Sequence, residues 1–427
     1  MKRIFVVGSG GREHALVRSL LRSPQHPDLV AAPGNAGIRR DRVPTLDVAA
    51  DDVEGLVRAA RDERVDLVVV GPEAPLVEGL VDALRAEGVP AFGPTAAAAR
   101  LEGSKAYAKE VMKAVGVPTA SHMVLRTREE ADAQIACASY PAVLKADVLA
   151  AGKGVLICAT EAEARDAIEQ FFGQRRFGET EVVLEEFLDG EELSLLALCD
   201  GVRAVPMAPA QDYKRIRDGD EGPNTGGMGS YSPVPGFDPE HARALALAVH
   251  QPIVDEMRRR GTPYHGVLYA GLMMTASGPT VLEYNCRFGD PETQAVLPRL
   301  RSDLVDLLER STREGGLDGV EIEWSSNWAV TVVLASRGYP ESSSKGDVIS
   351  GMRGIDSLNT EVFHAGTAER EDGGLVTAGG RVLNVTGLGE TPEKARDAAY
   401  GVADRIEFDG KQLRRDIAAR AVERVGA

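Results

Sequence analysis

The stretch that decides the fold of this chain runs over residues 141–160 and reads PAVLKADVLAAGKGVLICAT. Two apolar segments flank a loop of small residues, which predicts a β-hairpin. A P-loop is excluded, because Asp147 stands where its first glycine belongs and Gly154 stands where Ser or Thr must follow the lysine. The hairpin instead predicts a lid over phosphates, with glycine N–H groups in the loop and with charge from Lys145 and Lys153.

The hairpin lies at the centre of a strand–helix–hairpin–helix–strand pattern over residues 121–189, which we name the lid. A helical pattern over 104–120 precedes the lid, and its last strand ends in the acidic run VVLEEFLDGEE. Taken alone, that run is typical of a solvated strand exit. We expect 104–120 and 190–325 to form one larger unit from which the lid projects.

Residues 1–103 alternate short apolar strands with helical patterns, which predicts a parallel sheet with right-handed crossovers. Three strands run into the loops GSGG, APGNAG and GPEAPL, so all three loops should lie at the carboxyl edge where open α/β sheets bind ligands. A dinucleotide fingerprint is disfavoured, because Glu13 stands at the position of its third glycine. A phosphate at Gly10, Gly11 and the following helix N-terminus is one interpretation; a tight structural turn is the other.

Beyond residue 190 the sequence predicts a hairpin with an Asp-Gly turn, a long loop from Pro209 to Gly236, a single helix over 238–260 and a second hairpin. From about residue 325 the strands WAVTVVLAS and GRVLNVTGLG precede a helix with Thr391 as its N-cap and Pro392 at its first position. Residues 326–427 therefore read as a small α+β domain.

The second of these hairpins ends in EYNCRFGDPET, residues 283–293. Alternation along a strand places Glu283, Asn285 and Arg287 on one face. Carboxylate and amide oxygens suit Mg²⁺, whose remaining ligands would be phosphate oxygens and water. Arg287 on the same face would meet an anion beside the metal.

The composition narrows the function. The 427 residues carry a formal net charge of −16, which disfavours nucleic acid and acidic membrane surfaces as partners. The four cysteines are widely spaced and suggest no disulfide or metal framework. The N-terminal apolar segment is too short for a signal peptide, and no apolar run approaches a membrane span, so we expect a cytoplasmic protein.

Together these motifs resemble the ATP-grasp ligases, and among them the phosphoribosylamine–glycine ligase family of the purine pathway. The resemblance runs nearly end to end, through GGREHAL, APGNAG, GPEAPLV, FGPT, LEGSKA, KADVLAAGKGV, EEFLDGEE, GPNTGGMGSYSP, YAGLM, NCRFGDPETQ and FHAGT. It implies an α/β and α+β multidomain ATP-grasp fold, with a Rossmann-like N-terminal domain and a small C-terminal α+β domain. ATP would lie between two antiparallel sheets.

The resemblance also implies roles for individual residues. The nucleotide would be bound by Lys105, Lys145, Lys153, the stretch Glu185, Glu186, Phe187 and Leu188, and Glu192. Mg²⁺ or Mn²⁺ would be bound by Glu283 and Asn285. The amino-sugar phosphate would be held by Gly10, Gly11, Asn35, Glu73, Thr225, Gly226 and Gly227. Glycine would be placed by Asp212 at its ammonium and by Arg287 at its carboxylate, and Arg287, Lys145, Lys153 and Asp212 would serve the chemistry.

The implied activity is the ATP-dependent ligation of glycine to 5-phosphoribosylamine through glycyl phosphate, by a monomer or weak dimer. Two positions depart from the family pattern: Val148 stands where a lid-loop glycine is common, which puts the loop geometry in question, and Tyr213 replaces a common histidine. Three rival hypotheses are another ATP-grasp ligase with a different acid, an NAD-dependent oxidoreductase and a non-catalytic nucleotide sensor. The motif pair GPNTGGMG and NCRFGDPE disfavours the first hypothesis, and Glu13 disfavours the second because it breaks the dinucleotide fingerprint. The presence of Glu283, Asn285 and Arg287 disfavours the third.

Overall fold

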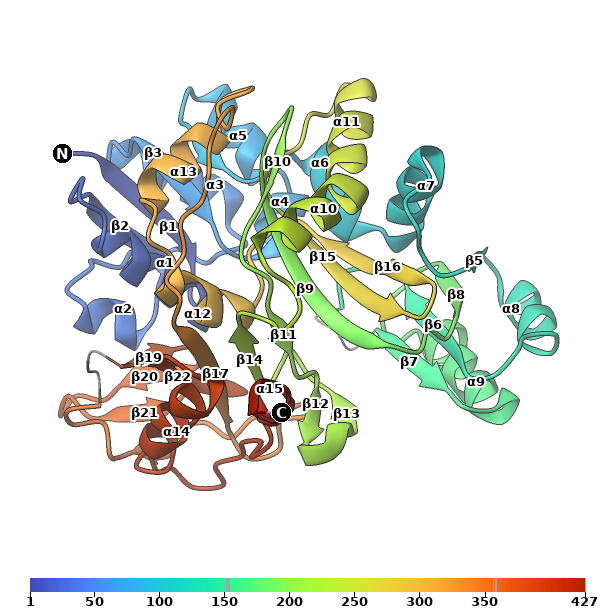
Figure 1. The fold of residues 1–427 in the computed structure, drawn as a ribbon. Helices are drawn as coiled ribbons and strands as arrows, with labels where there is room; N and C mark the ends of the chain where they lie inside the picture. The colour runs from blue at the N-terminus through green and yellow to red at the C-terminus, as the bar shows by residue number, and fades with distance from the viewer. Residues whose placement is uncertain (151–153, 356, 358, 427) are drawn as a thin grey trace.

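The computed structural model describes residues 1–150, 154–355, 357 and 359–426. Most of the chain forms one continuous body, and the lid projects from one side of it (Figure 1). Buried side chains of the N-terminal, central and C-terminal sheets, such as Phe5, Leu195 and Val332, belong to one apolar cluster. The lid has its own apolar cluster around Leu144 and Phe171, separate from the cluster of the main body.

The N-terminal sheet is parallel, as predicted, with the strand order β2-β1-β3-β4. Val7 pairs with both Ala32 and Val70, so three strands end at one edge and bring their loops together. The strands are β1 (Arg3–Gly8), β2 (Asp28–Pro33), β3 (Leu67–Val70) and β4 (Ala91–Phe92), and the helices are α1 (Gly11–Leu21), α2 (Ala36–Arg40), α3 (Val53–Asp62), α4 (Glu73–Val77), α5 (Leu80–Ala86) and α6 (Ala96–Gly103).

The lid is an antiparallel sheet of order β5-β8-β6-β7, joined to α6 through α7. The predicted hairpin is confirmed: Lys145 on β6 pairs with Val155 on β7. Helices cover one side of this sheet (Figure 1). The elements are α7 (Lys105–Val115), β5 (His122–Leu125), α8 (Arg128–Ile135), β6 (Ala142–Ala146), β7 (Val155–Cys158), α9 (Glu161–Ile168), η1 (Glu169–Gly173) and β8 (Val182–Glu186).

The central sheet is antiparallel, with the order β10-β9-β15-β16, and contains both predicted hairpins. The prediction of one helix over 238–260 is wrong: the chain forms two helices that meet at His250. Pro252 explains the break, because it has no N–H to continue the helical ladder. The elements are β9 (Glu191–Asp200), β10 (Ala204–Pro206), α10 (Pro239–Val249), α11 (Gln251–Arg259), β15 (His265–Thr275), β16 (Gly278–Asn285), α12 (Glu292–Val296), η3 (Leu297–Arg299) and α13 (Leu304–Ser311).

The prediction of a long loop from Pro209 to Gly236 is also wrong, because this segment contains four short strands. Two of them, β11 (Gln211–Asp212) and β14 (Gly229–Ser232), extend the C-terminal sheet, and the other two, β12 (Arg215–Arg217) and β13 (Glu221–Asn224), form a hairpin around η2 (Asp218–Asp220). All four residues of β14 are buried between β11 and β17, although its sequence GSYS is polar and small. Neighbouring strands satisfy its backbone, which the local sequence could not indicate.

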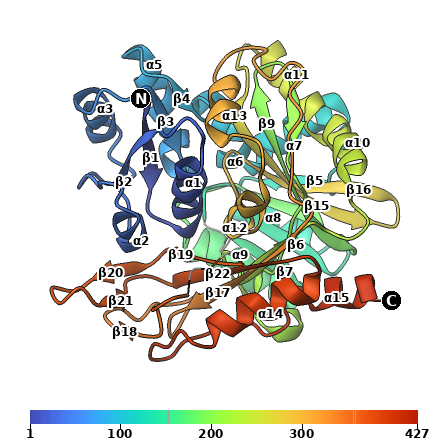
Figure 2. The same cartoon turned by 60° about the vertical axis from the view of Figure 1, so that its left-hand side comes forward.

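The C-terminal sheet has the order β11-β14-β17-β22-β19. Helix α14 packs on its outer face, away from the N-terminal domain (Figure 2). Thr391 caps α14 as predicted, by accepting a hydrogen bond from the Lys394 N–H. The remaining elements are β17 (Trp328–Ala335), β18 (Val348–Ile349), β19 (Thr360–His364), β20 (Thr367–Glu369), β21 (Leu375–Thr377), β22 (Arg381–Gly389), α14 (Pro392–Ala403) and α15 (Ala419–Gly426). Among the helices of the described residues, none is long and apolar enough to cross a membrane.

Candidate active site

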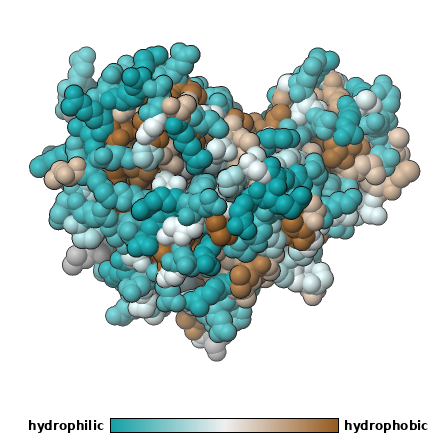
Figure 3. Space-filling view, turned by 90° about the horizontal axis from the view of Figure 1, so that it is seen from above, coloured by the Kyte–Doolittle hydropathy of each residue, from teal (hydrophilic) through white to brown (hydrophobic). Residues whose placement is uncertain are grey.

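A cavity of about 750 Å³ lies between the lid, the central sheet and the short strands β11, β12 and β13. A space-filling view from above shows the molecule notched between the lobe that contains the lid and the rest (Figure 3). Segments from all parts of the chain line the cavity. They include these predicted site residues: Glu73, Lys105, Lys145, Glu185, Glu186, Phe187, Leu188, Glu192, Asp212, Thr225, Gly226, Glu283, Asn285 and Arg287. Lys153 lies outside the described residues.

Two lysines share one buried carboxylate at the lid side of the cavity. Glu185 on β8 lies 2.9 Å from Lys145 Nζ and 3.1 Å from Lys109 Nζ. Lys109 also donates to the Thr119 hydroxyl and Lys145 donates to the Leu282 carbonyl, so each ammonium has an additional oxygen partner. Burial lowers the pKa of Lys109 to about 8, against the opposing effect of Glu185. The Glu185 carboxylate is therefore ion-paired with both lysines.

The turn that follows β6 is tied to the start of α7. Asp147 accepts hydrogen bonds from the Ser104 hydroxyl and the Ala106 N–H, both at 2.9 Å, and Lys105 Nζ donates to the Val148 carbonyl at 3.0 Å. Val148 does not adopt a positive φ, so the strain considered for a β-branched residue here does not arise. Burial lowers the pKa of Lys105. Tyr213, the other departure from the family pattern, is buried and accepts a hydrogen bond from the Ala418 N–H.

Glu283, Asn285 and Arg287 all line the cavity, as the predicted alternation requires, although β16 ends at Asn285 and Tyr284 contributes to the same lining. On the other face Tyr284 donates to the Val249 carbonyl, and Phe288 is buried. Burial opposes ionisation of Glu283, but nearby cations, Lys214 first among them, hold its pKa below the usual value. An ionised carboxylate at the end of β16 thus faces the cavity.

Arg287 is enclosed by acids from the N-terminal domain. Its Nε donates to Glu73 at 3.2 Å, and its Nη2 donates to Glu102 at 3.0 Å and to Asn285 Oδ1 at 3.1 Å. Burial opposes ionisation of Glu73, yet Arg287 and Arg12 lower its pKa to about 2. In this structure Arg287 is therefore paired with two side-chain carboxylates, and a glycine carboxylate would have to replace one of them.

The donor set fits a divalent cation that is only partly coordinated by protein. Glu283 and Asn285 offer two oxygens side by side at the end of β16. Within the described part of the chain, no three His, Cys, Asp or Glu side chains gather in a way that would hold a metal by themselves. Mg²⁺ tolerates this arrangement, because it usually retains water and takes phosphate oxygens as ligands.

A second acidic cluster surrounds Asp212. The Ser194 hydroxyl lies 3.4 Å from Asp212 Oδ1, 3.3 Å from Glu292 Oε1 and 2.9 Å from the Tyr269 hydroxyl, which itself donates to Glu292 at 3.1 Å. Burial and the nearby carboxylates raise the pKa of Asp212 to about 7, although Lys214 opposes the shift. Lys214 is ion-paired with Glu192, the residue predicted for the ribose hydroxyls.

Three predicted phosphate ligands lie away from the cavity. The Gly10 N–H donates to Glu13 at 2.6 Å, and Gly11 is buried so closely against Asn384 that no Cβ would fit. Asn35 is buried as the N-cap of α2, and its amide donates to backbone carbonyls. This geometry agrees with the tight-turn interpretation of GSGG, and a phosphate at Gly10 and Gly11 stays a prediction.

The glycine-rich loop does reach the cavity, through Thr225 and Gly226 but not through Gly227. The Gly226 N–H donates to the Tyr339 hydroxyl at 2.9 Å, and the Gly227 N–H donates to Thr225 Oγ1 at 3.0 Å. Gly227 adopts a φ of +108°, which a residue with a side chain rarely adopts. The loop is thus held by its own contacts, and its backbone donors are engaged.

Three family models match in succession: the phosphoribosylglycinamide synthetase N domain over residues 2–102, its ATP-grasp (A) domain over 103–293 and its C domain over 329–420. The chain belongs to the phosphoribosylglycinamide synthetase family. A curated relative from Ralstonia nicotianae, a phosphoribosylamine–glycine ligase, is 48% identical over 99% of this chain and 100% of its own length. A Vibrio parahaemolyticus protein of the same name is 47% identical, with 99% coverage of each chain.

Solved structures support the same family and fold. The phosphoribosylamine–glycine ligase of Thermotoga maritima matches with a TM-score of 0.83 and 39% identity, over 97% of this chain and 100% of that one. A biotin carboxylase from Campylobacter jejuni matches with a TM-score of 0.72 at 14% identity, over 96% of this chain and 93% of that one. This second likeness concerns the fold alone. The predicted multidomain ATP-grasp fold is confirmed.

Several cavity residues of this family member were not singled out from the sequence: Arg12, Glu102, Lys109, Glu292 and Arg381. Three of them lie within family motifs that were recognised, namely GGREHAL, LEGSKA and GDPETQ. Lys109 had a local signal, because it falls among buried residues of the amphipathic helix α7. Arg381 begins an apolar strand far along the chain, and nothing near it in sequence indicates the cavity.

Proposed function

We propose that this protein catalyses the ATP-dependent ligation of glycine to 5-phosphoribosylamine, which yields glycinamide ribonucleotide, ADP and phosphate. One observation carries the proposal: a single cavity contains Lys105 and Lys145, the oxygen pair of Glu283 and Asn285, and the acid Asp212. The two lysines suit nucleotide phosphates. The oxygen pair suits a divalent cation, and the carboxylate of Asp212 suits an ammonium group. Family membership supports the same reaction.

The chemistry requires these charges, because the glycine carboxylate must attack the γ-phosphate and both are anions. Two unit charges 4 Å apart repel by about 1 kcal/mol in water and by several-fold more in a drier site. Lys105 and Lys145 would offset this repulsion, and Lys153 of the lid loop would lower it further. Bound at Glu283 and Asn285, Mg²⁺ or Mn²⁺ would neutralise phosphate charge and polarise the reacting phosphoryl group.

Glycine is placed by its two charged ends. Asp212 would accept hydrogen bonds from the ammonium, and Arg287 would bind the carboxylate after it exchanges one of its acidic partners. The 1-amino group of phosphoribosylamine then attacks the carbonyl carbon of glycyl phosphate, and the carbon–oxygen bond to phosphate breaks. No covalent enzyme intermediate is needed.

The lid would close over the nucleotide and keep water from the acyl phosphate. Its separate apolar core lets it move as a unit, and its inner surface exposes Leu149, Ile157 and Phe187 to the cavity in this structure. Phe187 and the backbone of residues 185–188 would line the adenine, and Glu192 would bind the ribose after exchange with Lys214. We propose the same four regions as before: 1–103, 104–120 with 190–325, the lid, and 326–427.

The direct test is ADP release with Mg²⁺, glycine and freshly formed phosphoribosylamine. We expect ADP release only when both substrates are present, because the reaction is completed only when the amine consumes glycyl phosphate. Replacement of glycine by acetate, which lacks the ammonium, should abolish release. ADP formation without the amine, or with another carboxylic acid in place of glycine, would contradict the proposal.

Glycine affinity should depend on pH through Asp212. Its pKa is raised to about 7, so the carboxyl becomes neutral as pH falls and can no longer pair with the glycine ammonium, which stays protonated. We expect the KM for glycine to rise by about tenfold per pH unit below pH 7. Steady-state kinetics at saturating ATP would measure this, and Asp212→Asn should raise KM at pH 8 and remove the pH dependence. A pH-independent KM in the unmodified protein would contradict the role of Asp212.

We further propose a cytoplasmic monomer or weak dimer. The four cysteines, Cys137, Cys158, Cys199 and Cys286, are free thiols in the structure, which fits a reducing compartment. Light scattering over a concentration series would test the assembly state.

A further inference from the structure

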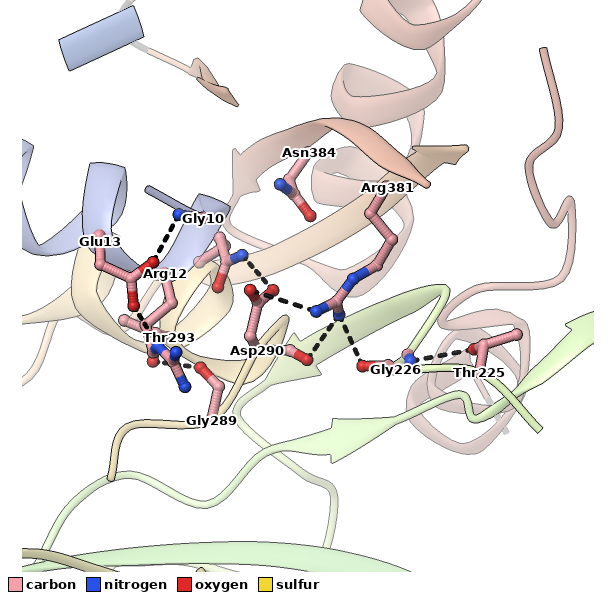
Figure 4. A network of polar contacts seen from close by, with 12 residues as sticks. Gly10, Arg12, Glu13, Thr225, Gly226, Gly289, Asp290, Thr293, Arg381 and Asn384 are labelled. Carbon is pink, nitrogen blue, oxygen red and sulfur yellow. Dashed lines mark hydrogen bonds and ion pairs between the residues drawn. The ribbon is translucent and has the colours of Figure 1, made fainter. Parts of the chain in front are cut away.

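Arg381 brings a guanidinium from the C-terminal sheet to the glycine-rich loop. It is the first residue of β22, and its Nη1 donates to the Gly226 carbonyl at 2.6 Å and to the Asp290 carbonyl at 2.8 Å. Its Nη2 lies 3.3 Å from the Asp290 carboxylate (Figure 4). A Cβ at residue 226 would lie only 3.0 Å from Arg381 Cζ, so Gly226 permits the guanidinium to lie against the loop.

An anion at this end of the cavity needs a side-chain donor. The backbone N–H groups of Gly226 and Gly227 are already engaged, and so is that of Gly10. An anion could use them only by breaking these contacts. Arg381 instead offers a permanent charge that lines the same space.

Two other guanidinium groups of the cavity lie closer to carboxylates than Arg381 does. Arg287 is shared by Glu73 and Glu102 at 3.2 and 3.0 Å, and Arg12 is paired with Glu13. Among the residues that the structure describes, Arg381 is ion-paired with Asp290 alone, at the longer distance of 3.3 Å. Exchange of that partner for a phosphate would leave the two backbone contacts of Nη1 intact, so the loop would stay in place.

The position suits the far end of an amino sugar. Arg381 contacts Asp290, which follows Arg287 by three residues, and both guanidinium groups line the same cavity. A substrate whose amine lies near Asp212 and Arg287 would therefore extend its 5-phosphate toward the loop at Gly226.

We propose that Arg381 binds the 5-phosphate of the amino sugar, with the phosphate replacing the Asp290 carboxylate as the partner of Nη2. This inference rests on the proposed function. It makes Arg381 a specificity-determining residue, because a substrate without the phosphate would leave the Arg381–Asp290 pair undisturbed.

The test compares 5-phosphoribosylamine with ribosylamine, each formed in situ from the sugar and ammonia. In the unmodified protein the phosphorylated amine should be strongly preferred in kcat/KM. Arg381→Gln should lower kcat/KM for the phosphorylated amine by roughly 10- to 100-fold more than it lowers the value for ribosylamine, which loses only the effect of the loop contacts of Nη1. Arg381→Lys should recover part of the preference, because lysine keeps the charge but lacks the paired N–H donors of the guanidinium group.

Two controls separate binding from folding. Arg370→Gln removes an exposed guanidinium of the same domain, paired with Asp372, and should leave the preference unchanged. Reversible formation of glycyl phosphate exchanges ¹⁸O between the bridging and non-bridging positions of ATP. This exchange depends on glycine but not on the amine, and it should persist in Arg381→Gln. If Arg381→Gln slowed both amines equally, or abolished the exchange, the inference would be wrong. If the unmodified protein released no ADP with either amine, the proposed function itself would fail.

Discussion

Glu283→Gln should lower kcat by about a thousandfold or more while the protein remains folded. The side chain ends β16 among Lys105, Lys145, Lys214 and Arg287, and their combined charge keeps it ionised in spite of burial. Glutamine has nearly the same shape but no charge, so it would bind a divalent cation poorly. ADP release at saturating substrates measures the effect, and titration of Mg²⁺ and Mn²⁺ should show that neither metal restores the rate at ordinary concentrations.

The appropriate control is an acid of the same type away from the cavity. Glu179 on the lid is exposed and forms an ion pair with Arg175, so Glu179→Gln should retain the kcat of the unmodified protein. The thermal midpoint of Glu283→Gln should fall below that of this control while the protein remains folded at the assay temperature, because the surrounding cations lose a carboxylate whose ionised form the fold stabilises. Near-normal turnover in Glu283→Gln would show that the metal is not bound at the end of β16.

The sequence predicted those parts of the fold in which hydrophobic periodicity and turn chemistry agree. The parallel N-terminal sheet and the lid hairpin around residues 147–154 are examples, because each is defined by contacts between neighbouring segments. The strands β11 and β14 were missed for the opposite reason. Strand β14 forms because β17, about 100 residues later, pairs with it, and β11 then pairs with the other edge of β14.

In the candidate site, too, local features could be predicted from the sequence and contacts between distant segments could not. Alternation alone placed Glu283, Asn285 and Arg287 on one face, since that is a local property of a strand. The partners of Arg287 could not be predicted, because Glu73 and Glu102 are 214 and 185 residues away in sequence. The partner of Gly10 was not predicted: its N–H donates a hydrogen bond to the side chain of Glu13 in the first turn of α1, and the phosphate predicted at this turn stays a prediction.

The second large effect concerns stability. Glu185→Gln should lower the free energy of unfolding by about 3 to 5 kcal/mol at pH 7, because it leaves the Lys109 and Lys145 ammoniums buried without their shared carboxylate. The side chains of Lys109 and Glu185 are each only 2% exposed, so water cannot take the place of the lost charge. Urea denaturation followed by fluorescence or circular dichroism would measure the change.

Glu186→Gln is the matched control, since it is the next residue of β8, is exposed, and accepts a hydrogen bond from the Ser121 N–H that glutamine can also accept. Its effect should remain within about 0.5 kcal/mol. The double variant Glu185→Gln with Lys109→Met should recover part of the loss, because one of the two unpaired ammoniums is gone. No recovery would mean that the lysines are not the source of the destabilisation.

The loss should also shrink as pH rises, and the sign follows from Lys109. Its pKa is lowered to about 8 in the folded protein, against about 10.4 for an exposed lysine, so between these values the unfolded chain binds the additional proton and stability increases with pH. Without Glu185 the folded pKa falls further, because a favourable charge is removed. The variant should therefore begin to regain stability at a lower pH than the unmodified protein and should differ least from it near pH 10. A deficit that stayed constant from pH 7 to pH 10 would show that Lys109 remains charged and paired without Glu185.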